Sequence, residues 1–215
     1  MRLGPLARVM LARMLPILIH EILTARKAYI VEIGRIKIIV FRGCFRPDIS
    51  YSTYLTMLGL LRILKKLNNI RKICEIGTGS GAISITVAKI FKRYVVVTDI
   101  SAISILNVRK NIKLTGSDEN IDIVRTYAGS CLRDLSFDLA VTNPPYLPCD
   151  RYVEICSGLD MKILKEILKD CYRIVRRGGK VLYTTSSIAP IVLGRVIDEV
   201  RTPIDTVYLV VIERC

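Results

Sequence analysis

The chain has 215 residues, 51% of them hydrophobic, and a formal net charge of +14 at pH 7. This length suits one domain with a modest extension, and the hydrophobic content argues against a disordered chain. The positive charge favours an acidic partner such as nucleic acid or an acidic protein, although a basic protein without such a partner has the same composition. The absence of Gln beside many Lys, Arg and Ile residues is typical of a thermophile.

The chain has seven cysteines, an odd number, and its sequence contains no Cys-x-x-Cys motif. This pattern indicates neither a disulfide framework nor a metal site, and we expect small buried side chains in a reducing cytoplasm. Residues 3–27 are apolar at helical spacing, but Arg8, Arg13 and Glu21 interrupt them too often for a membrane span. No cleavage site of small residues follows, so we expect no signal peptide.

The N-terminal part predicts a helix over residues 3–27, kinked or broken near Pro16, and then a hairpin. Its strands, 29–33 and 36–41, are rich in β-branched residues and flank Gly34-Arg35. The first 46 residues hold nine Lys or Arg against two Glu. This basic face either contacts substrate phosphates or is simply solvated. We predict an extension over 1–50 and a second unit over 51–215.

After an apolar helix at 54–67, strands and helices alternate. We expect strands at 71–76, 94–99, 121–126 and 137–142, with helices at 80–91 and 101–113 between the first three. Such alternation predicts an α/β fold with a mostly parallel sheet and helices on both faces. The remaining elements are a helix at 161–175 that Gly178-Gly179 ends, a strand at 180–185, a helix at 188–200 and a strand at 208–213.

A glycine-rich turn follows the first of these strands. The motif Glu75-Ile76-Gly77-Thr78-Gly79-Ser80-Gly81 lies between a strand and a helix, where glycines let the backbone approach a ligand. It lacks the Lys-Ser/Thr of a triphosphate loop, and its spacing differs from that of dinucleotide sites. About 20 residues further on, Asp99 ends the next strand, where a carboxylate is placed to bind ribose hydroxyls. Alternatively, Asp99 only caps the helix that begins near Ser101.

A second motif, Asn143-Pro144-Pro145-Tyr146, ends the strand Phe137–Thr142. The prolines stop the strand and hold the Asn143 amide on a rigid turn beside an aromatic ring. The Asn143 side-chain oxygen and the Pro144 carbonyl can each accept one hydrogen of a planar NH2 group, while Tyr146 lies against its flat face. The plain alternative is a strand followed by a proline-rich loop.

Together these motifs resemble the class I S-adenosylmethionine-dependent methyltransferases, in the branch with an Asn-Pro-Pro-Tyr motif. The resemblance runs from about Ile73 to Ser187. Within it, Ser157–Asp160 and Gly178–Leu182 resemble the archaeal and eukaryotic release-factor glutamine methyltransferases, which are related to the HemK family. The resemblance implies a Rossmann-like fold, S-adenosyl-L-methionine as cofactor, and methylation of an amide or exocyclic nitrogen.

The resemblance also assigns residues. It implies Asn143, Pro144 and Tyr146 as catalytic residues, with Pro145 and Pro47 beside them in the substrate-binding site. The expected cofactor-binding residues are Glu75, Gly77, Thr78, Gly79, Gly81, Asp99, Ile100, Ser130 and Asn143. Ser130 stands where relatives carry an acidic residue for the adenine amino group.

Three functions follow as hypotheses. The first is methylation of a glutamine amide in a translation release factor, and the second is methylation of adenine or guanine amino groups in RNA or DNA. The third is a non-catalytic binding subunit. Relatives of the first kind work with a small zinc-binding activator protein, which we expect at the sheet edge Ile121–Thr126. The sequence alone leaves the substrate open.

Overall fold

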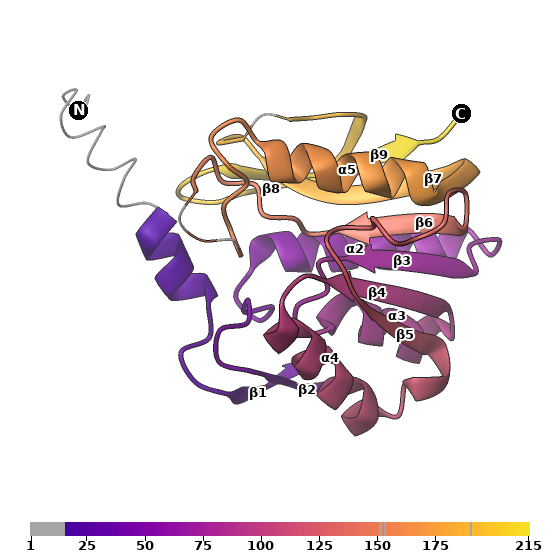
Figure 1. Cartoon of the computed structure of the whole chain (residues 1–215), viewed down its shortest axis with the longest axis horizontal. Coiled ribbons are helices and arrows are strands. Elements are labelled where there is room, and N and C mark those ends of the chain that lie inside the picture. Colours follow the sequence, from indigo (N-terminus) through magenta and orange to yellow (C-terminus); the bar gives the residue numbers. More distant parts are fainter. Residues whose placement is uncertain (1–15, 151, 153, 190) are drawn as a thin grey trace.

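The computed structural model describes residues 16–150, 152, 154–189 and 191–215 (Figure 1). The strands are β1 (Tyr29–Ile33), β2 (Ile36–Val40), β3 (Lys72–Ile76), β4 (Tyr94–Asp99), β5 (Ile121–Arg125), β6 (Phe137–Thr142), β7 (Val175–Ser186), β8 (Arg195–Arg201) and β9 (Thr206–Glu213). The helices are α2 (Tyr51–Lys66), α3 (Ala82–Phe91), α4 (Ala102–Thr115) and α5 (Lys162–Ile174), with a 3-10 turn at Asp118–Asn120. Residues 16–23 are also helical, and residues 3–15 of the helix expected over 3–27 lie outside the described residues. The helix ends earlier than expected, because Thr24 forms an antiparallel bridge with Phe45.

A seven-stranded sheet forms the centre, in the order β5-β4-β3-β6-β7-β9-β8. The first five strands of that order run parallel, and β9 runs antiparallel to both of its neighbours. Short apolar strands separated by amphipathic helices produce this arrangement, because each crossover helix returns the chain to the same end of the sheet. The predicted mostly parallel α/β sheet is confirmed.

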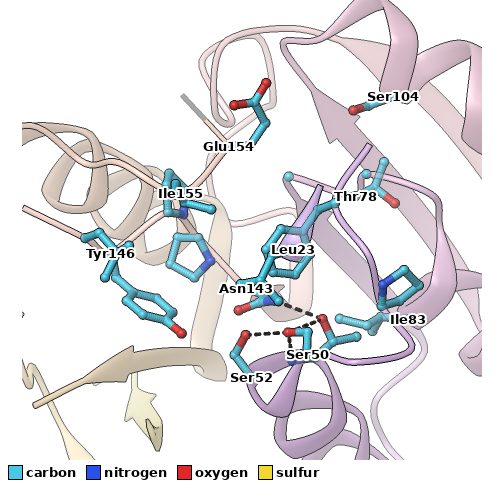
Figure 2. A pocket seen from close by; sticks show the side chains of 18 of the residues that line it. Leu23, Ser50, Ser52, Thr78, Ile83, Ser104, Asn143, Tyr146, Glu154 and Ile155 are labelled. Carbon is cyan, nitrogen blue, oxygen red and sulfur yellow. Dashed lines mark hydrogen bonds between the residues drawn. The ribbon is translucent and has the colours of Figure 1, made fainter. Parts of the chain in front are cut away.

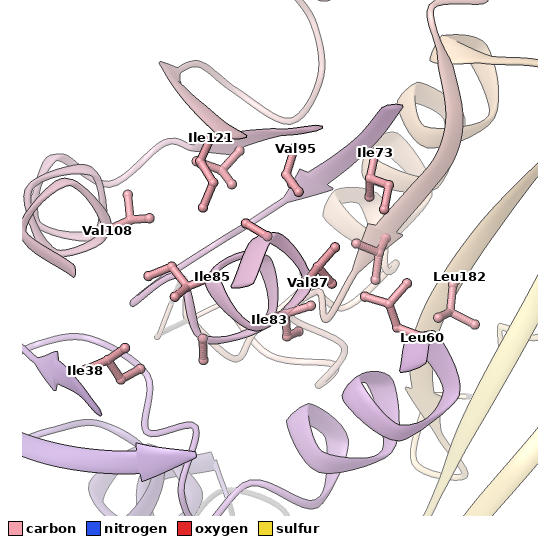
Figure 3. Close-up of a cluster of buried hydrophobic side chains, with 14 of the residues drawn as sticks. Ile38, Leu60, Ile73, Ile83, Ile85, Val87, Val95, Val108, Ile121 and Leu182 are labelled. Carbon is pink, nitrogen blue, oxygen red and sulfur yellow. The ribbon is translucent and has the colours of Figure 1, made fainter. Parts of the chain in front are cut away.

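Alternation along the strands divides the interior into two cores. Ile73 of β3 faces a core that it shares with Leu60 of α2 and Ile85 of α3, drawn in Figure 3. Cys74, the next residue, faces the other core, which contains Leu164 and other side chains of α5. Helices α2, α3 and α4 therefore cover one face of the sheet and α5 covers the other.

The hairpin β1-β2 forms a separate two-stranded sheet, as predicted from Gly34-Arg35. Two buried asparagines of α4 hold it. The side-chain oxygen of Asn111 accepts from the Ile39 N–H, and that of Asn107 accepts from the Phe41 N–H, each at 2.8 Å. The side-chain NH2 groups of both asparagines donate to the Ile39 carbonyl at 2.7 Å. The hairpin residue Ile38 belongs to the same core as Ile73, Leu60 and Ile85. The boundary at residue 50 stays a prediction.

In the C-terminal third of the chain, the structure differs from two expectations. Residues 195–201 form β8 rather than part of a helix, and β8 pairs with β9 as the second antiparallel strand. Gly194 has φ +128°, and a Cβ there would lie 2.4 Å from the Val211 carbonyl oxygen, so glycine admits a close turn into the strand. Helix α5 ends at Ile174, before the glycine pair, and Gly179 lies inside β7, where a Cβ would lie 2.8 Å from the Asp138 carbonyl oxygen.

The expectation of no disulfide is wrong, because Cys149 and Cys156 are bonded. The chain folds back between them: the Leu147 N–H donates to the Ile155 carbonyl and the Ser157 N–H to that of Leu147. This turn brings together two cysteines that are seven residues apart in sequence. Three other cysteines, Cys44, Cys74 and Cys171, are buried free thiols, as expected, whereas Cys131 and Cys215 are exposed, contrary to the expectation. Among the described residues, no helix has the length and apolar character needed to cross a membrane.

Candidate active site

Strand register brings the two sequence motifs to one place. Ile76 of β3 pairs with Thr98 of β4 on one side and with Thr142 of β6 on the other. The next residues along these strands are Gly77, Asp99 and Asn143. These three residues therefore leave the carboxyl edge of the sheet side by side, which is where ligands bind in parallel sheets.

A cavity of about 730 Å³ opens at this edge. Its wall includes the glycine turn, the end of β4, the Asn-Pro-Pro-Tyr segment and the start of α2, and Figure 2 shows part of it. Apolar side chains from the helical residues 16–23 and from the segment after Tyr146 complete the wall. The volume lies within the range of small-molecule sites.

Gly77 and Gly79 form an open cradle in this wall. Both have positive φ values, +77° and +55°, which glycine adopts without strain. A Cβ built on either residue meets no atom within 4 Å, so side chains there would project into free space next to the cavity. Gly81 differs, because its Cβ would lie 2.6 Å from Val108 Cγ2 of α4. Gly77 and Gly79 thus leave room for a ligand, whereas Gly81 allows helix packing.

Glu75 places a buried carboxyl group behind the cradle. Its side chain is 2% exposed and accepts hydrogen bonds from Thr78 Oγ1 at 2.9 Å and from the Ser84 hydroxyl. Burial raises the pKa of Glu75 to about 7, and the hydroxyl hydrogen bonds only partly offset this effect. A buried carboxyl group at a cavity wall is suited to a cationic ligand group, which would restore its ionised form.

Asp99 ends β4 beside the cradle and lines the same cavity. Its Oδ2 accepts from the Gly79 N–H and its Oδ1 from the Ser101 N–H, both at 2.9 Å. Burial raises the pKa of Asp99, and these two backbone hydrogen bonds lower it in part. Ser101 itself caps α4 through its own hydroxyl, which accepts from the Ser104 N–H. Since Ser101 fills the capping role, the carboxylate of Asp99 remains available to the cavity.

Asn143, Pro144, Pro145 and Tyr146 all line the cavity. The Asn143 amide lies between two threonines: Thr184 Oγ1 donates to its Oδ1 at 2.7 Å, and its Nδ2 donates to Thr53 Oγ1 at 3.1 Å. Both threonine side chains are buried. The side chain of Tyr146 is partly buried, and desolvation raises the pKa of Tyr146 to about 12, with a partial offset from hydrogen bonding to Ser52.

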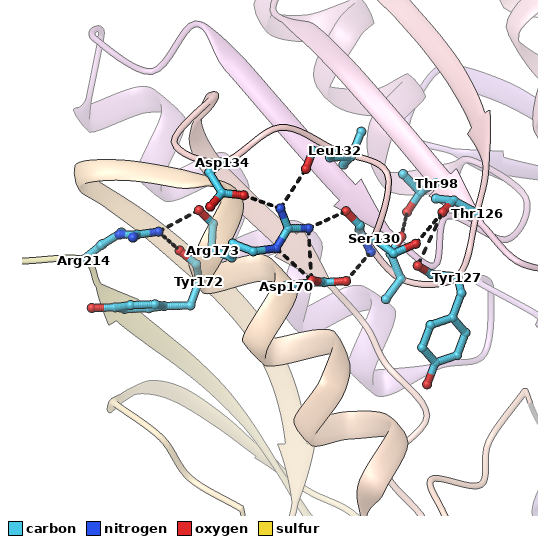
Figure 4. Close-up of polar contacts among 12 residues, drawn as sticks. Thr98, Thr126, Tyr127, Ser130, Leu132, Asp134, Asp170, Tyr172, Arg173 and Arg214 are labelled. Carbon is cyan, nitrogen blue, oxygen red and sulfur yellow. Dashed lines mark hydrogen bonds and ion pairs between the residues drawn. The ribbon is translucent and has the colours of Figure 1, made fainter.

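The segment after β5 supplies a further part of the wall through Tyr127 and Ala128. Arg173 of α5 holds this segment by donating to the carbonyls of Gly129 at 2.7 Å and Leu132 at 2.8 Å. Figure 4 shows Arg173 between Leu132, Asp134 and Asp170. Asp170, on the same helix, accepts from the Gly129 N–H at 3.0 Å. The ion pair of Arg173 and Asp170 on α5 therefore fixes the position of the loop after β5, which has no regular secondary structure.

The structure brings most of the expected site residues together. Pro47, Glu75, Thr78, Asp99 and Ile100 line the cavity with the glycine cradle and the Asn-Pro-Pro-Tyr segment. The cavity wall as described does not include Gly81 or Ser130. The Ser130 hydroxyl lies 3.0 Å from Thr126 Oγ1 instead.

Several residues that line the cavity or hold Asn143 escaped the sequence reasoning. Thr53 lies 90 residues before Asn143, so no local pattern links them. Thr184 lies within the strand that the sequence predicted over 180–185. The pairing of Thr142 with Tyr183 then places Thr184 beside Asn143, at the carboxyl edge of the neighbouring strand. Glu154 and Ile155 reach the cavity only because the disulfide-bonded segment folds back.

Comparison with known proteins identifies the class. Residues 56–207 match the family described as the methyltransferase small domain, and the chain belongs to this family. The class I methyltransferase predicted from the two motifs is therefore confirmed, together with its S-adenosylmethionine cofactor. The glycine cradle and the two acidic side chains fit a cofactor that carries ribose hydroxyls and cationic groups.

Two relatives are release factor glutamine methyltransferases. The chain is 31% identical to that of Borreliella burgdorferi over 113 residues, which cover 51% of this chain and 39% of the relative. It is 28% identical to that of Dictyoglomus turgidum over 189 residues, which cover 81% of this chain and 65% of the relative. The chain thus spans between about two fifths and two thirds of these two relatives.

A solved structure shares the fold. The ribosomal protein L11 methylase of Lactobacillus delbrueckii subsp. bulgaricus superposes with a TM-score of 0.57 at 20% identity. The superposition covers 76% of this chain and 79% of that protein. It confirms the Rossmann-like methyltransferase fold predicted from the alternation of strands and helices.

Proposed function

We propose that this protein transfers a methyl group from S-adenosylmethionine to the side-chain amide nitrogen of a glutamine in a translation release factor. The observation that carries the proposal is the Asn143 amide, held beside the Gly77 cradle at the wall of one cavity. The release factor glutamine methyltransferases among the relatives support the choice of acceptor.

The residues have separate tasks in this proposal. The carboxylate of Asp99 would hold the ribose hydroxyls of the cofactor, and the buried carboxyl group of Glu75 would favour its cationic amino-acid part. Gly77 and Gly79 let the backbone approach the ligand closely. When bound, the cofactor supplies a methyl group already activated by its sulfonium sulfur, so the protein mainly has to orient the acceptor.

An amide nitrogen is a poor nucleophile because its lone pair is delocalised into the carbonyl. Hydrogen bonds from the acceptor NH2 to Asn143 Oδ1 and to the Pro144 carbonyl favour the geometry in which that lone pair points at the methyl group. These bonds strengthen as positive charge develops on the nitrogen, and this difference between ground and transition state is what accelerates the reaction. The extra proton on the nitrogen would pass to solvent after transfer, so the step needs no strong general base.

The experiment is a transfer assay with methyl-labelled S-adenosylmethionine and three separate acceptors: the release factor of the source organism, tRNA and double-stranded DNA. We expect label in the release factor, and a variant of that factor with its acceptor glutamine changed to alanine should take up none. Label in tRNA or DNA alone would instead support amino-group methylation of nucleobases, in line with the +14 charge. Absence of label from all three acceptors would contradict enzymatic methylation of either class.

We also propose a zinc-binding activator protein as partner, at the edge of the sheet. Strand β5 is the outermost strand beside β4, and Ile123 and Val124 on it are half-buried. An edge of this kind invites strand addition. Co-expression should give a stable heterodimer, whereas the chain alone should self-associate in gel filtration. A monodisperse and fully active monomer would contradict this partner.

A further inference from the structure

The hydrogen bonds of Asn143 come from two separate elements. Thr184 lies on β7 and donates to Oδ1, while Thr53 lies in the first turn of α2 and accepts from Nδ2. The exposed fraction is 5% for Thr53 and 0% for Thr184, so water does not compete at either hydroxyl. Strand register and helix packing together therefore determine the orientation of this one amide.

Hydroxyl groups at the start of α2 extend this arrangement. Thr53 Oγ1 donates to Ser50 Oγ at 3.1 Å, and Ser50 Oγ also accepts from the Thr53 N–H as the cap of α2. Ser50 Oγ lies a further 2.9 Å from Ser52 Oγ, as Figure 2 shows. Because the hydroxyl hydrogen of Thr53 is used by Ser50, its oxygen is left to accept from Asn143. This assigns the NH2 side of the Asn143 amide to α2 and the carbonyl side to β7.

The two threonines leave the Asn143 amide with free hydrogen-bonding sites for a ligand. An amide oxygen has two lone pairs and an amide nitrogen two hydrogens, and each threonine takes only one of them. Oδ1 therefore keeps one acceptor site for the incoming NH2 group. The side chain is fixed without being saturated, which is what a preorganised acceptor requires.

We propose that Thr53 and Thr184 are positioning residues for catalysis: together they hold the Asn143 amide with its oxygen presented to the acceptor nitrogen. This inference rests on the proposed function, because it assigns a task to the residue that grips the acceptor. Without the threonine hydroxyls, the amide samples other orientations, and the productive one is populated for a smaller part of the time.

The test replaces each hydroxyl by a methyl group of the same shape. Thr184→Val and Thr53→Val should each lower kcat by about tenfold or more, while KM for the release factor and Kd for S-adenosylmethionine change by less than about threefold. Thr184→Ser and Thr53→Ser retain the hydroxyl and should restore most of kcat. The contrast between the Val and Ser variants separates loss of the hydrogen bond from loss of packing.

Matched controls lie on the same two elements. Thr185 on β7 donates only to the Ala189 carbonyl at 2.9 Å, and Thr56 on α2 donates only to the Ser52 carbonyl at 2.8 Å. Thr185→Val and Thr56→Val also bury an isosteric methyl group but leave Asn143 untouched, so kcat should stay within about twofold of wild type. A loss of kcat in these controls equal to that in Thr184→Val would assign the effect to general packing and overturn the inference.

A readout without turnover uses the side-chain amide itself. In the 15N–1H spectrum of the cofactor-free protein, the Asn143 NH2 pair, assigned by its loss in Asn143→Ala, should shift in Thr184→Val and stay in place in Thr185→Val. If Asn143→Ala is inactive but both Val variants keep full kcat and an unshifted amide pair, the positioning role is wrong and the proposed function stands. If Asn143→Ala keeps full activity, the proposed function itself fails.

Discussion

The backbone N–H of Gly79 donates to Oδ2 of Asp99 across 2.9 Å, and this bond ties the glycine turn after β3 to the end of β4. The two residues thus belong to one side of the cavity although 20 positions separate them. The remaining acceptor capacity of the Asp99 carboxylate is what we assign to the ribose hydroxyls.

The first prediction concerns this carboxylate. Asp99→Ala should weaken S-adenosylmethionine binding by at least about tenfold, since each charge-assisted hydrogen bond is worth about 1.5–3 kcal/mol. Calorimetric titration measures the effect, with Asp118→Ala as control because Asp118 is an exposed residue of the 3-10 turn. The fold should persist in Asp99→Ala, with a lower Tm from the lost bonds to Gly79 and Ser101. Equal affinity in Asp99→Ala and wild type would contradict the ribose assignment.

The second prediction concerns pH. Burial raises the pKa of Glu75 from 4.5 to about 7, so the folded protein holds this proton more tightly than the unfolded chain does. The contribution of Glu75 to the free energy of unfolding is therefore full below its ordinary pKa and is lost as the pH rises through about 7. Glu75→Gln should remove this dependence and stabilise the cofactor-free protein at about pH 8 by at most about 3 kcal/mol.

Thermal melts of the cofactor-free protein across this pH range test the effect of Glu75. The difference in Tm between Glu75→Gln and wild type should grow as the pH rises from about 4.5 to about 7 and level off above that pH. Glu119→Gln, at an exposed position, provides a control whose curve should follow wild type. Parallel curves for Glu75→Gln and wild type would show that Glu75 does not titrate in this way.

The third prediction concerns the loop after β5. Arg173→Met removes the donor to Gly129 and Leu132 and leaves the carboxylates of Asp134 and Asp170 without their partner. Breaking such a partly buried network should cost about 2–4 kcal/mol of unfolding free energy. Chemical denaturation measures it, and Arg177→Met, an exposed arginine of β7, should change stability by less than about 0.5 kcal/mol. Similar losses in both variants would remove the special role of Arg173.

The fourth prediction concerns the disulfide beside the site. Denatured but unreduced protein should present five reactive thiols, because Cys149 and Cys156 are bonded. Closing so short a loop stabilises a fold by about 2–3 kcal/mol in the chain-entropy account, so the double variant Cys149→Ser/Cys156→Ser should melt at a lower temperature. A thiol titration that finds all seven cysteines reactive before reduction would contradict the bond.

The sequence predicted much of the sheet because its signals are local. Apolar strands that end at Asp99 and Thr142, together with the amphipathic helices of the α/β alternation, determine both the parallel sheet and the edge at which the site forms. The C-terminal helix was wrongly expected because Ile188–Val200 is apolar at a spacing that suits either structure, whereas pairing with β9 settles it as a strand. That pairing depends on residues distant in sequence.

The sequence predicted the two motifs of the candidate site, but not the residues from other segments that hold these motifs in place. Glycine spacing and the proline pair are readable, since each limits the backbone directly. The hydroxyl of Thr53 and the return of Ile155 to the cavity arise from packing between distant segments, which no local pattern encodes. The disulfide escaped for the same reason, because a fold-back of the chain rather than a spacing rule brings Cys149 to Cys156.

The central claim is that Asn143 orients the acceptor nitrogen. Its most direct test is single-turnover transfer to the release factor by Asn143→Ala at saturating S-adenosylmethionine, together with the cofactor affinity of the same variant. The account predicts a rate at least about 100-fold below wild type with cofactor affinity changed less than about threefold. A rate equal to wild type would contradict it.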